Sequence, residues 1–316
     1  MRFDHTQLVI RGRHLPELAD LALLTLRRFP ALSGWLLLGI LPLALMESAL
    51  LWWLPGIEER DLEYDRGEFW GTPRFLWHYV LLGHLLVPLA SLPATLYLGQ
   101  AMFLAHPSSR QIWNDLRRLA GRWVWQFGVV GGGLWYAIAL ATLPHNSQRH
   151  SFRELVLPGL LTLVLWLIRA RAPFVPEIIA LERCPIRGRD GQISTRRRSH
   201  ILHRHSGADL LTRAVLLVPM YTAIFFFALF ALVAVRQLLI GEPSWDSWTV
   251  QLLVPIAFWM TAGFSIVVRF LSYLDLRIRQ EGWEVELLMR AEAARLRAPT
   301  AALASGSRTA PAGEAA

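Results

Sequence analysis

The chain has 316 residues and a formal net charge of +8, with 54% hydrophobic and only 18% charged residues. Soluble domains carry about a quarter of charged residues, so this composition argues against an ordinary water-soluble enzyme and favours a membrane protein. The single cysteine excludes an internal disulfide and a multi-cysteine metal site. The absence of lysine excludes a Schiff-base lysine and the lysine of a phosphate-binding loop.

The first predicted element is an amphipathic helix over residues 14–28. Its apolar residues recur with helical spacing and form one stripe. Pro16 suits a first helical turn, and Arg27 and Arg28 suit the negative carboxyl end. The segment is too short to cross a membrane, and we predict that it lies flat on the inner surface. The next apolar run starts near Ala31 and is too long for the core of a cleavable signal peptide.

Six apolar runs follow, and we predict that each forms a membrane-spanning helix, since about 20 residues cross the roughly 30 Å of hydrocarbon. Their ranges are 31–55, 75–98, 123–143, 154–181, 214–235 and 250–268. Pro88 and Pro93 are expected to kink the second. The fourth is the least regular, because Arg169 and Arg171 interrupt it and must snorkel to headgroups. The sequence predicts an all-α polytopic transmembrane bundle with amphipathic interfacial helices, a single domain over 1–297 and a disordered tail over 298–316.

The distribution of arginine predicts the orientation. With six crossings, 26 of the 32 arginines fall on one side. Cytoplasmic segments collect positive charge, so we predict that the N and C termini are cytoplasmic in a bacterial inner (cytoplasmic) membrane. Tryptophans at the predicted span ends form the aromatic belts of the two interfaces.

Four polar residues lie inside predicted spans: Glu47, His78, His84 and Glu177. A buried acid in lipid is expensive, and such residues are often functional, for instance in a proton relay. The structural alternative is that Glu47 is a neutral carboxylic acid, or is bonded to His78 or His84 across the bundle. Both interpretations remain open from the sequence.

A basic inner segment lies between the fourth and fifth spans. It contains Cys184 and three histidines between residues 200 and 205, but the surrounding arginines oppose a bound dication, and the spacing fits no common zinc module. We therefore predict no metal site. Juxtamembrane arginines attract anionic lipid headgroups. The predicted contacts are Arg187, Arg189, Arg196, Arg197, Arg198, Arg277 and Arg279. No aromatic residues interleave for base stacking, so nucleic acid is not an expected partner.

The segment from Tyr273 to Gly282, with Asp275, Arg277 and Arg279, resembles the end of bacterial multi-pass proteins related to the membrane domain of glycerophosphoryl diester phosphodiesterases. The predicted N-terminal surface helix and Arg197-Arg198-Ser199 also fit that pattern. In such phosphodiesterases a separate soluble barrel holds the active site, and this chain has no such barrel. The resemblance therefore implies a stand-alone membrane module without phosphodiesterase activity. Asp275 and Arg279 are also spaced as i, i+4 partners on a helix.

No nucleophile, metalloprotease or nucleotide motif appears, so we predict no catalytic residues and no cofactor. The first functional hypothesis is a non-enzymatic scaffold or accessory module that contacts the lipid bilayer and other membrane proteins. The second is a small-solute or proton-coupled transporter that uses Glu47 and the histidines of the second span. The third is an inner-leaflet lipid-modifying enzyme that uses the arginine-rich loop.

Overall fold

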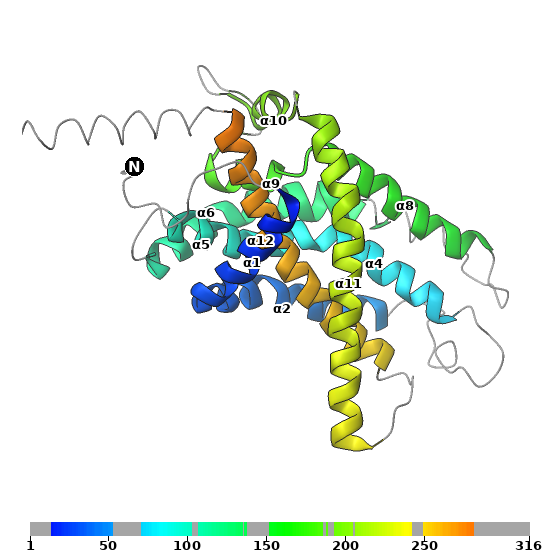
Figure 1. The fold of residues 1–316 in the computed structure, drawn as a ribbon. Coiled ribbons are helices and arrows are strands. Elements are labelled where there is room, and N and C mark those ends of the chain that lie inside the picture. Colours follow the sequence, from blue (N-terminus) through cyan, green and yellow to red (C-terminus); the bar gives the residue numbers. More distant parts are fainter. Residues whose placement is uncertain are drawn as a thin grey trace, which may run out of the picture.

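The computed structural model describes residues 14–52, 71–102, 107–134, 136–137, 152–185, 188, 193–204, 206–241 and 249–280. Every regular element in these ranges is a helix, which confirms the predicted all-α class (Figure 1). Residues 298–316, predicted to be disordered, lie outside the described residues.

The N-terminal amphipathic helix is α1 (Leu15–Arg28), in close agreement with the predicted range. It buries Leu18, Ala22 and Thr25 against the rest of the protein and packs on α12 and α2. Leu23 and Leu24 on its other side are exposed. A one-residue break at Phe29 separates it from α2 (Pro30–Trp52), which is uniformly apolar around its circumference.

The second predicted span is interrupted where its prolines lie. α4 (Gly71–Ala90) contains Pro88, α5 (Leu92–Ala101) begins with Pro93 in its first turn, and Ser91 separates them. Proline lacks a backbone N–H and clashes with the preceding turn, so a break here was expected. α2 packs against both helices, and its closest approach is at Gly39, where a side chain would collide with the carbonyl oxygen of Ala90.

α6 (Ser109–Trp123) is an amphipathic helix whose N-cap, Ser108, accepts a hydrogen bond from the backbone N–H of Gln111 at 3.4 Å. It continues into a π-helix, η3 (Val124–Gly133). η3 runs antiparallel to α4, since a Cβ atom on Gly128 would lie 3.8 Å from the Leu89 side chain and one on Gly132 would lie 3.5 Å from Leu85. Residues 138–143 of the predicted third span lie outside the described residues.

The fourth predicted span is not one helix. α8 (Phe152–Arg171) and α9 (Val175–Leu181) meet at an angle of 53°. The prediction of a continuous helix over 154–181 was therefore wrong. Pro173 and Pro176 explain the break, because neither residue can donate the backbone hydrogen bond that would continue α8.

The remaining helices are α10 (Thr195–His203), α11 (Gly207–Ile240), the short π-helix η4 (Thr249–Leu253) and α12 (Val254–Gln280). α12 is the central element, because it packs against α1, α2, α5 and α11. In Figure 1, α12 (orange) passes through the middle of the molecule, while α11 (yellow) runs along the outside and extends beyond the other helices.

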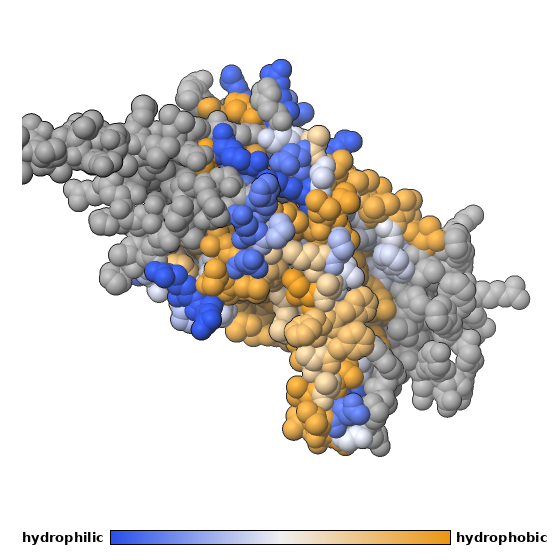
Figure 2. Space-filling model, viewed as in Figure 1, coloured by the Kyte–Doolittle hydropathy of each residue, from blue (hydrophilic) through white to orange (hydrophobic). Residues whose placement is uncertain are grey.

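Four helical segments in the described part of the chain are long and apolar enough to cross a membrane, and the bent pair α8–α9 would make a fifth. They differ in burial. The most apolar windows of α4–α5 and α12 are 78% and 61% buried, whereas those of α2 and α11 are 22% and 11% buried. Apolar surface covers most of the exposed length of α11, and hydrophilic residues gather at the end where α10 lies (Figure 2). The chain is therefore a candidate multi-span membrane protein.

Candidate functional site

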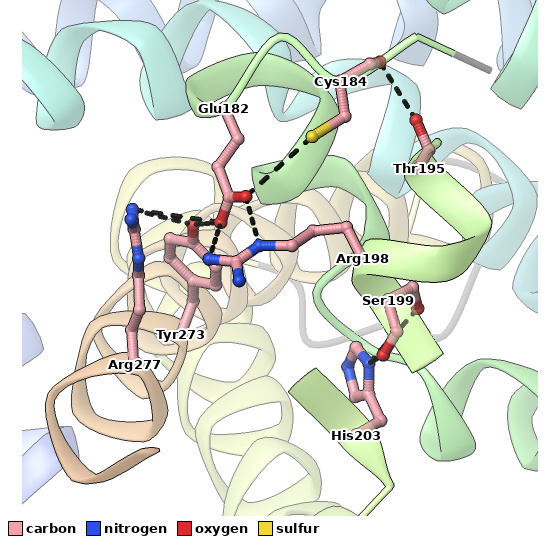
Figure 3. A network of polar contacts seen from close by, with 8 residues as sticks. All are labelled: Glu182, Cys184, Thr195, Arg198, Ser199, His203, Tyr273 and Arg277. Carbon is pink, nitrogen blue, oxygen red and sulfur yellow. Dashed lines mark hydrogen bonds and ion pairs between the residues drawn. The ribbon is translucent and has the colours of Figure 1, made fainter. Parts of the chain in front are cut away.

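Glu182, which directly follows α9, contacts polar groups from several elements (Figure 3). Arg198 of α10 donates from Nε to Oε2 at 2.5 Å and from Nη2 to Oε1 at 3.2 Å. Tyr273 of α12 donates its hydroxyl to Oε1 at 2.7 Å, and Nη1 of Arg277 lies 3.9 Å from the same oxygen. One carboxylate thus joins α9, α10 and α12.

The charge of Glu182 is stabilised by these neighbours. Burial acts to raise the pKa of Glu182, but the hydrogen bonds from Arg198 and Tyr273 and the positive charge of Arg277 outweigh it and hold the pKa below its ordinary value of 4.5. Hydrogen bonds to a charged acceptor are shorter and stronger than neutral ones. The Glu182 cluster is therefore a stable ionic joint at neutral pH.

The only cysteine lies beside this joint. Sγ of Cys184 is 3.9 Å from Oε2 of Glu182, and burial together with this carboxylate raises the pKa of the thiol. A protonated thiol is a poor nucleophile, so the environment does not activate Cys184. Its carbonyl oxygen accepts hydrogen bonds from the Thr195 hydroxyl at 3.0 Å and from the Arg122 guanidinium, which ties α6 to α10.

A second ionic joint surrounds Asp275, which is only 3% exposed. Arg213 of α11 donates from Nη1 to its Oδ2 at 3.1 Å, and Nη2 of Arg279 lies 2.8 Å from the same oxygen. The i, i+4 pairing of Asp275 with Arg279 is confirmed. Arg213 also pairs with Asp209 at 3.2 Å, so this joint fastens α11 to α12.

Glu177, one of the predicted intramembrane polar residues, is fully buried in α9. Its Oε1 accepts a hydrogen bond from Nε of Arg269 on α12 at 2.7 Å. Shortly after α9, Arg183 pairs with Asp115 of α6 at 2.8 Å and links α6 to the same region. Thus the buried acids of this end of the molecule are held by arginines from other elements.

Glu47 is also fully buried, but its described partner is not a histidine. Oε2 of Glu47 accepts a hydrogen bond from Nε1 of Trp259 on α12 at 2.9 Å. Gly83 of α4 makes room for this contact, because a Cβ atom there would lie 3.1 Å from Oε1 of Glu47 and would collide with the Phe258 ring. Tyr79, one turn earlier in α4, stacks edge-to-face on Phe258 with ring centroids 5.4 Å apart.

The contacts described for the two histidines of α4 are with other residues. His78 is fully buried and meets Tyr136 edge-to-face at a centroid distance of 6.4 Å. The carbonyl oxygen of His84 accepts a hydrogen bond from the guanidinium of Arg169, which also donates to the Gly131 carbonyl at 3.4 Å. Pro88 explains this contact, because the residue four positions after His84 has no backbone N–H to donate.

The same logic applies one turn later. Pro93 leaves the Leu89 carbonyl without its helical donor, and the indole Nε1 of Trp123 lies 3.2 Å from that oxygen. Sequence reasoning predicted the kink but missed Trp123 and Arg169 as the donors that accompany it. The prolines could have predicted such donors. A proline in a membrane span leaves a carbonyl oxygen without its helical donor, and lipid supplies no water to replace it.

The four predicted polar residues do not form one site. Glu47 and Glu177 bind Trp259 and Arg269, and these partners are ten residues apart on α12, which is about 15 Å along a helix axis. The predicted headgroup arginines also divide. Arg198, Arg277 and Arg279 make ion pairs within the protein, Arg196 and Arg197 are exposed, and Arg187 and Arg189 lie outside the described residues.

Ser199 and His203 on α10 are the nearest approach to a catalytic pair. Nδ1 of His203 lies 2.6 Å from the Ser199 carbonyl oxygen, a contact that requires a proton on Nδ1. That nitrogen therefore cannot accept the Ser199 hydroxyl proton, although Oγ is 3.2 Å away. Among the described residues, no three histidine, cysteine, aspartate or glutamate side chains gather as metal ligands.

Comparisons with known proteins give no family. No family model, no curated protein and no solved structure matches the chain.

Proposed function

We propose that the chain is a six-crossing membrane module that acts, without catalysis, as a scaffold or accessory for partner proteins in a bacterial inner membrane. The observation that supports this role is that the buried acidic side chains form ion pairs between helices. Glu177, Glu182 and Asp275 are each fixed by arginines of other elements, so they join α9, α10, α11 and α12 into one frame. Catalytic or proton-carrying acids need access to a substrate or a proton path, which such fixed pairs oppose.

The path of η3 supports the third crossing. α6 ends beside Cys184, to whose carbonyl Arg122 donates, and η3 then runs back along α4 from Leu89 toward His78. α8 next packs Gly159 on Trp77, near the start of α4, with a closest Cβ distance of 3.6 Å. The chain thus passes from the polar end to the opposite end between α6 and α8. If the bent pair α8–α9 counts as one crossing, the five segments of sufficient length and this path support the proposed six crossings.

The orientation follows from arginine asymmetry. The proposed cytoplasmic side carries 26 of the 32 arginines, including those of the two ionic joints. Positive residues resist translocation, so N-in and C-in is the favoured arrangement.

Cysteine accessibility tests this topology. In a Cys184→Ser background, single cysteines replace Ser147, Ser244 or Arg204, and intact cells are treated with a membrane-impermeant maleimide. We expect labelling at 147 and 244 in intact cells, and at 204 only after the inner membrane is opened. Labelling of 147 only after opening would contradict the third crossing, and labelling of 204 in intact cells would contradict the orientation.

In-cell photo-crosslinking tests the role. A photoreactive residue replaces Trp113, which is 39% exposed on α6, or Phe227, which is 78% exposed on the apolar surface of α11. A scaffold should give a protein adduct of reproducible mass from position 113 and none from position 227. The absence of any protein adduct from α6, together with a wild-type mass after gentle solubilisation, would count against the role.

The transporter remains the second candidate, because Oε1 of buried Glu47 has no hydrogen-bond partner within the described structure. A Glu47→Gln substitution keeps an acceptor for Trp259 and removes the titratable group. If the chain is a scaffold, this variant should match the wild type in adduct formation and in cell growth. A growth defect with unchanged adducts and unchanged stability would favour the transporter.

We also propose that the segment from Tyr273 to Gly282 reflects a relation to the membrane domain of glycerophosphoryl diester phosphodiesterases. Tyr273, Asp275, Arg277 and Arg279, which carry the resemblance to the membrane domain of glycerophosphoryl diester phosphodiesterases, all contribute to the joints that hold α12 to α9 and α11. The motif then marks a structural joint, which is consistent with a role for this segment within a membrane module.

A further inference from the structure

The outward side of α10 is unlike its inward side. Thr195, Leu202 and His203 are buried, and Arg198 reaches inward to Glu182. The exposed residues are Arg196, Arg197, His200, Ile201 and Arg204. Arg197, His200, Ile201 and Arg204 follow i, i+3, i+4, i+7 spacing, so they form one continuous stripe. Ile193, which precedes the N-cap Ser194, is also exposed, at 46%.

This stripe carries uncompensated positive charge. α10 contains no acidic residue, and within the described structure Arg196, Arg197 and Arg204 make no ion pair with a carboxylate. By contrast, Arg198, which lies between them in sequence, forms an ion pair with Glu182. Ile201, 47% exposed, lies in the middle of the basic residues. Exposed arginines that flank an exposed aliphatic side chain are the pattern of a surface that meets headgroups and the first carbons of the acyl chains.

The position of α10 in the fold agrees with this partner. α10 lies at the end of the molecule where the upper ends of α11 and α12 also lie (Figure 1). The exposed apolar surface of α11 begins at Leu211 and Val215, seven and eleven residues after Arg204. α11 begins at Gly207, three residues after Arg204, so the stripe lies close along the chain to the start of that apolar surface.

We propose that the outward face of α10 binds the phosphate-containing headgroups of anionic lipids, through Arg196, Arg197 and Arg204, with Ile201 inserted between them. The inference rests on the proposed membrane location and names a partner for its polar end. The proposed contacts differ from those predicted from the sequence, because they include Arg204 and leave out Arg198. RNA fits less well, because the stripe offers no aromatic ring for a base.

Fluorescence quenching in nanodiscs tests the proposal on the full chain. In the Cys184→Ser background, bimane is attached to Ile201→Cys or to Phe227→Cys. The discs contain phosphatidylcholine alone or with about one third phosphatidylglycerol, an anionic fraction that gives a strong surface potential. Quenchers are spin labels on the headgroup or in mid-chain. We expect headgroup quenching at 201 to be at least about twofold stronger in the anionic discs and to fall in high salt.

Two triple variants carry the charge test. Arg196, Arg197 and Arg204→Gln should reduce quenching at 201 to the phosphatidylcholine value. Arg110, Arg117 and Arg118→Gln on α6 removes the same number of charges from the molecule and should leave it largely unchanged. Equal loss in both variants, or equal quenching in neutral and anionic discs, would overturn the proposal.

The label at 227 tests the membrane location independently of headgroup binding by α10. It should be quenched by the mid-chain probe, because Phe227 is exposed in the centre of an apolar helix. If 227 is quenched and 201 is not, α10 faces water or a protein, and only the headgroup inference fails. If neither position is quenched, the membrane location fails and the headgroup inference fails with it.

Discussion

At the scale of single residues, the structure shows how a helix with two prolines satisfies its backbone. Pro88 and Pro93 leave the carbonyl oxygens of His84 and Leu89 without helical donors. Arg169 of α8 donates to the first and Trp123 of α6 to the second. An unsatisfied carbonyl in lipid costs several kcal/mol, so these donors are part of what makes the kink tolerable.

This arrangement predicts that Arg169 and Pro88 are energetically coupled. Arg169→Met should lower the free energy of unfolding by about 2 kcal/mol, the range for a hydrogen bond to a charged donor. In a Pro88→Ala background, where the introduced alanine supplies the missing backbone N–H, the same substitution should lower it by clearly less. Denaturant unfolding in detergent micelles, analysed as a double-mutant cycle, measures the difference.

The control is Arg171→Met, an exposed arginine two residues later in α8. It should have little effect in either background. Equal losses for Arg169→Met with and without Pro88 would show that the arginine does not act through the carbonyl of His84.

The Glu182 joint predicts a dependence of stability on pH. The pKa of Glu182 is lowered in the folded protein, so its contribution is fully present above about pH 4.5 and is lost as the pH falls below that value. Glu182→Gln should lower the unfolding free energy by about 2 kcal/mol at pH 7, and this gap should narrow below pH 4.5. Melting curves from pH 7 to 3 measure it.

His203 acts in the same direction over a higher range. Burial lowers its pKa from 6.5, so the unfolded chain binds the proton more readily and stability also falls as the pH drops below 6.5. This effect is common to the wild type and to Glu182→Gln, and it cancels in the difference between them. A gap that stays constant from pH 7 to 3 would contradict the role assigned to Glu182.

At the scale of elements, close approach of helices depends on individual glycines. α2 crosses the junction of α4 and α5 at Gly39, where a Cβ atom would collide with the Ala90 carbonyl oxygen. A backbone atom cannot move aside as a flexible side chain can. Gly34 in the same helix has no atom within 4 Å of its Cβ position.

The two glycines form a matched pair for mutation. Gly39→Ala should destabilise the protein by about 1–3 kcal/mol, because α2 must shift away from α4. Gly34→Ala should leave stability unchanged or raise it by up to about 1 kcal/mol, since alanine is the better helix former. Thermal unfolding in micelles compares them, and similar effects at both positions would show that the crossing is not tightly packed.

The helices themselves were largely predictable from the sequence, whereas their partners were not. Apolar runs and helical periodicity gave α1 and α2 close to their observed limits, because these depend on local composition. They gave only the central part of α11, which extends beyond the predicted 214–235 at both ends. The angle between α8 and α9 depends on what α9 packs against, namely α5 and α10. No local pattern encodes that angle, although Pro173 and Pro176 could have indicated the break itself.

The same limit applies to the polar residues. Burial of Glu47 and Glu177 was predictable from their apolar flanks, but their partners Trp259 and Arg269 lie 212 and 92 residues away in sequence. Hydropathy places a residue in the bilayer without fixing which side of its helix faces which neighbour. The histidines were reasonable guesses for Glu47, but the hydrogen bond described for Glu47 comes from Trp259, and His78 contacts the ring of Tyr136.

At the scale of the whole molecule, burial and charge divide the protein into zones. α4–α5 and α12 form the interior, and α2 and α11 present apolar side chains outward. Arg213 and Arg236 bound the uncharged stretch of α11, whose 22 residues measure about 33 Å, close to the thickness of the hydrocarbon. Arg236 donates to the Thr249 hydroxyl at 2.6 Å and so joins α11 to η4 near the opposite boundary.

These zones predict that equally exposed positions on α11 differ in their tolerance of a charged side chain, according to their depth in the membrane. Phe227 and Leu239 are 78% and 80% exposed, but Phe227 lies well inside the stretch between the two arginines and Leu239 lies beyond Arg236. Phe227→Asp should disfavour membrane insertion by about 2.5–3.5 kcal/mol, the penalty of a charge at the centre of a span. Leu239→Asp should have a much smaller effect, because its carboxylate reaches the headgroups. The fraction of chain that resists carbonate extraction from membranes measures both. Were the exposed surface of α11 in water, both aspartates would be tolerated equally, and were it covered by a second protein, their effects would follow the interface and not the depth.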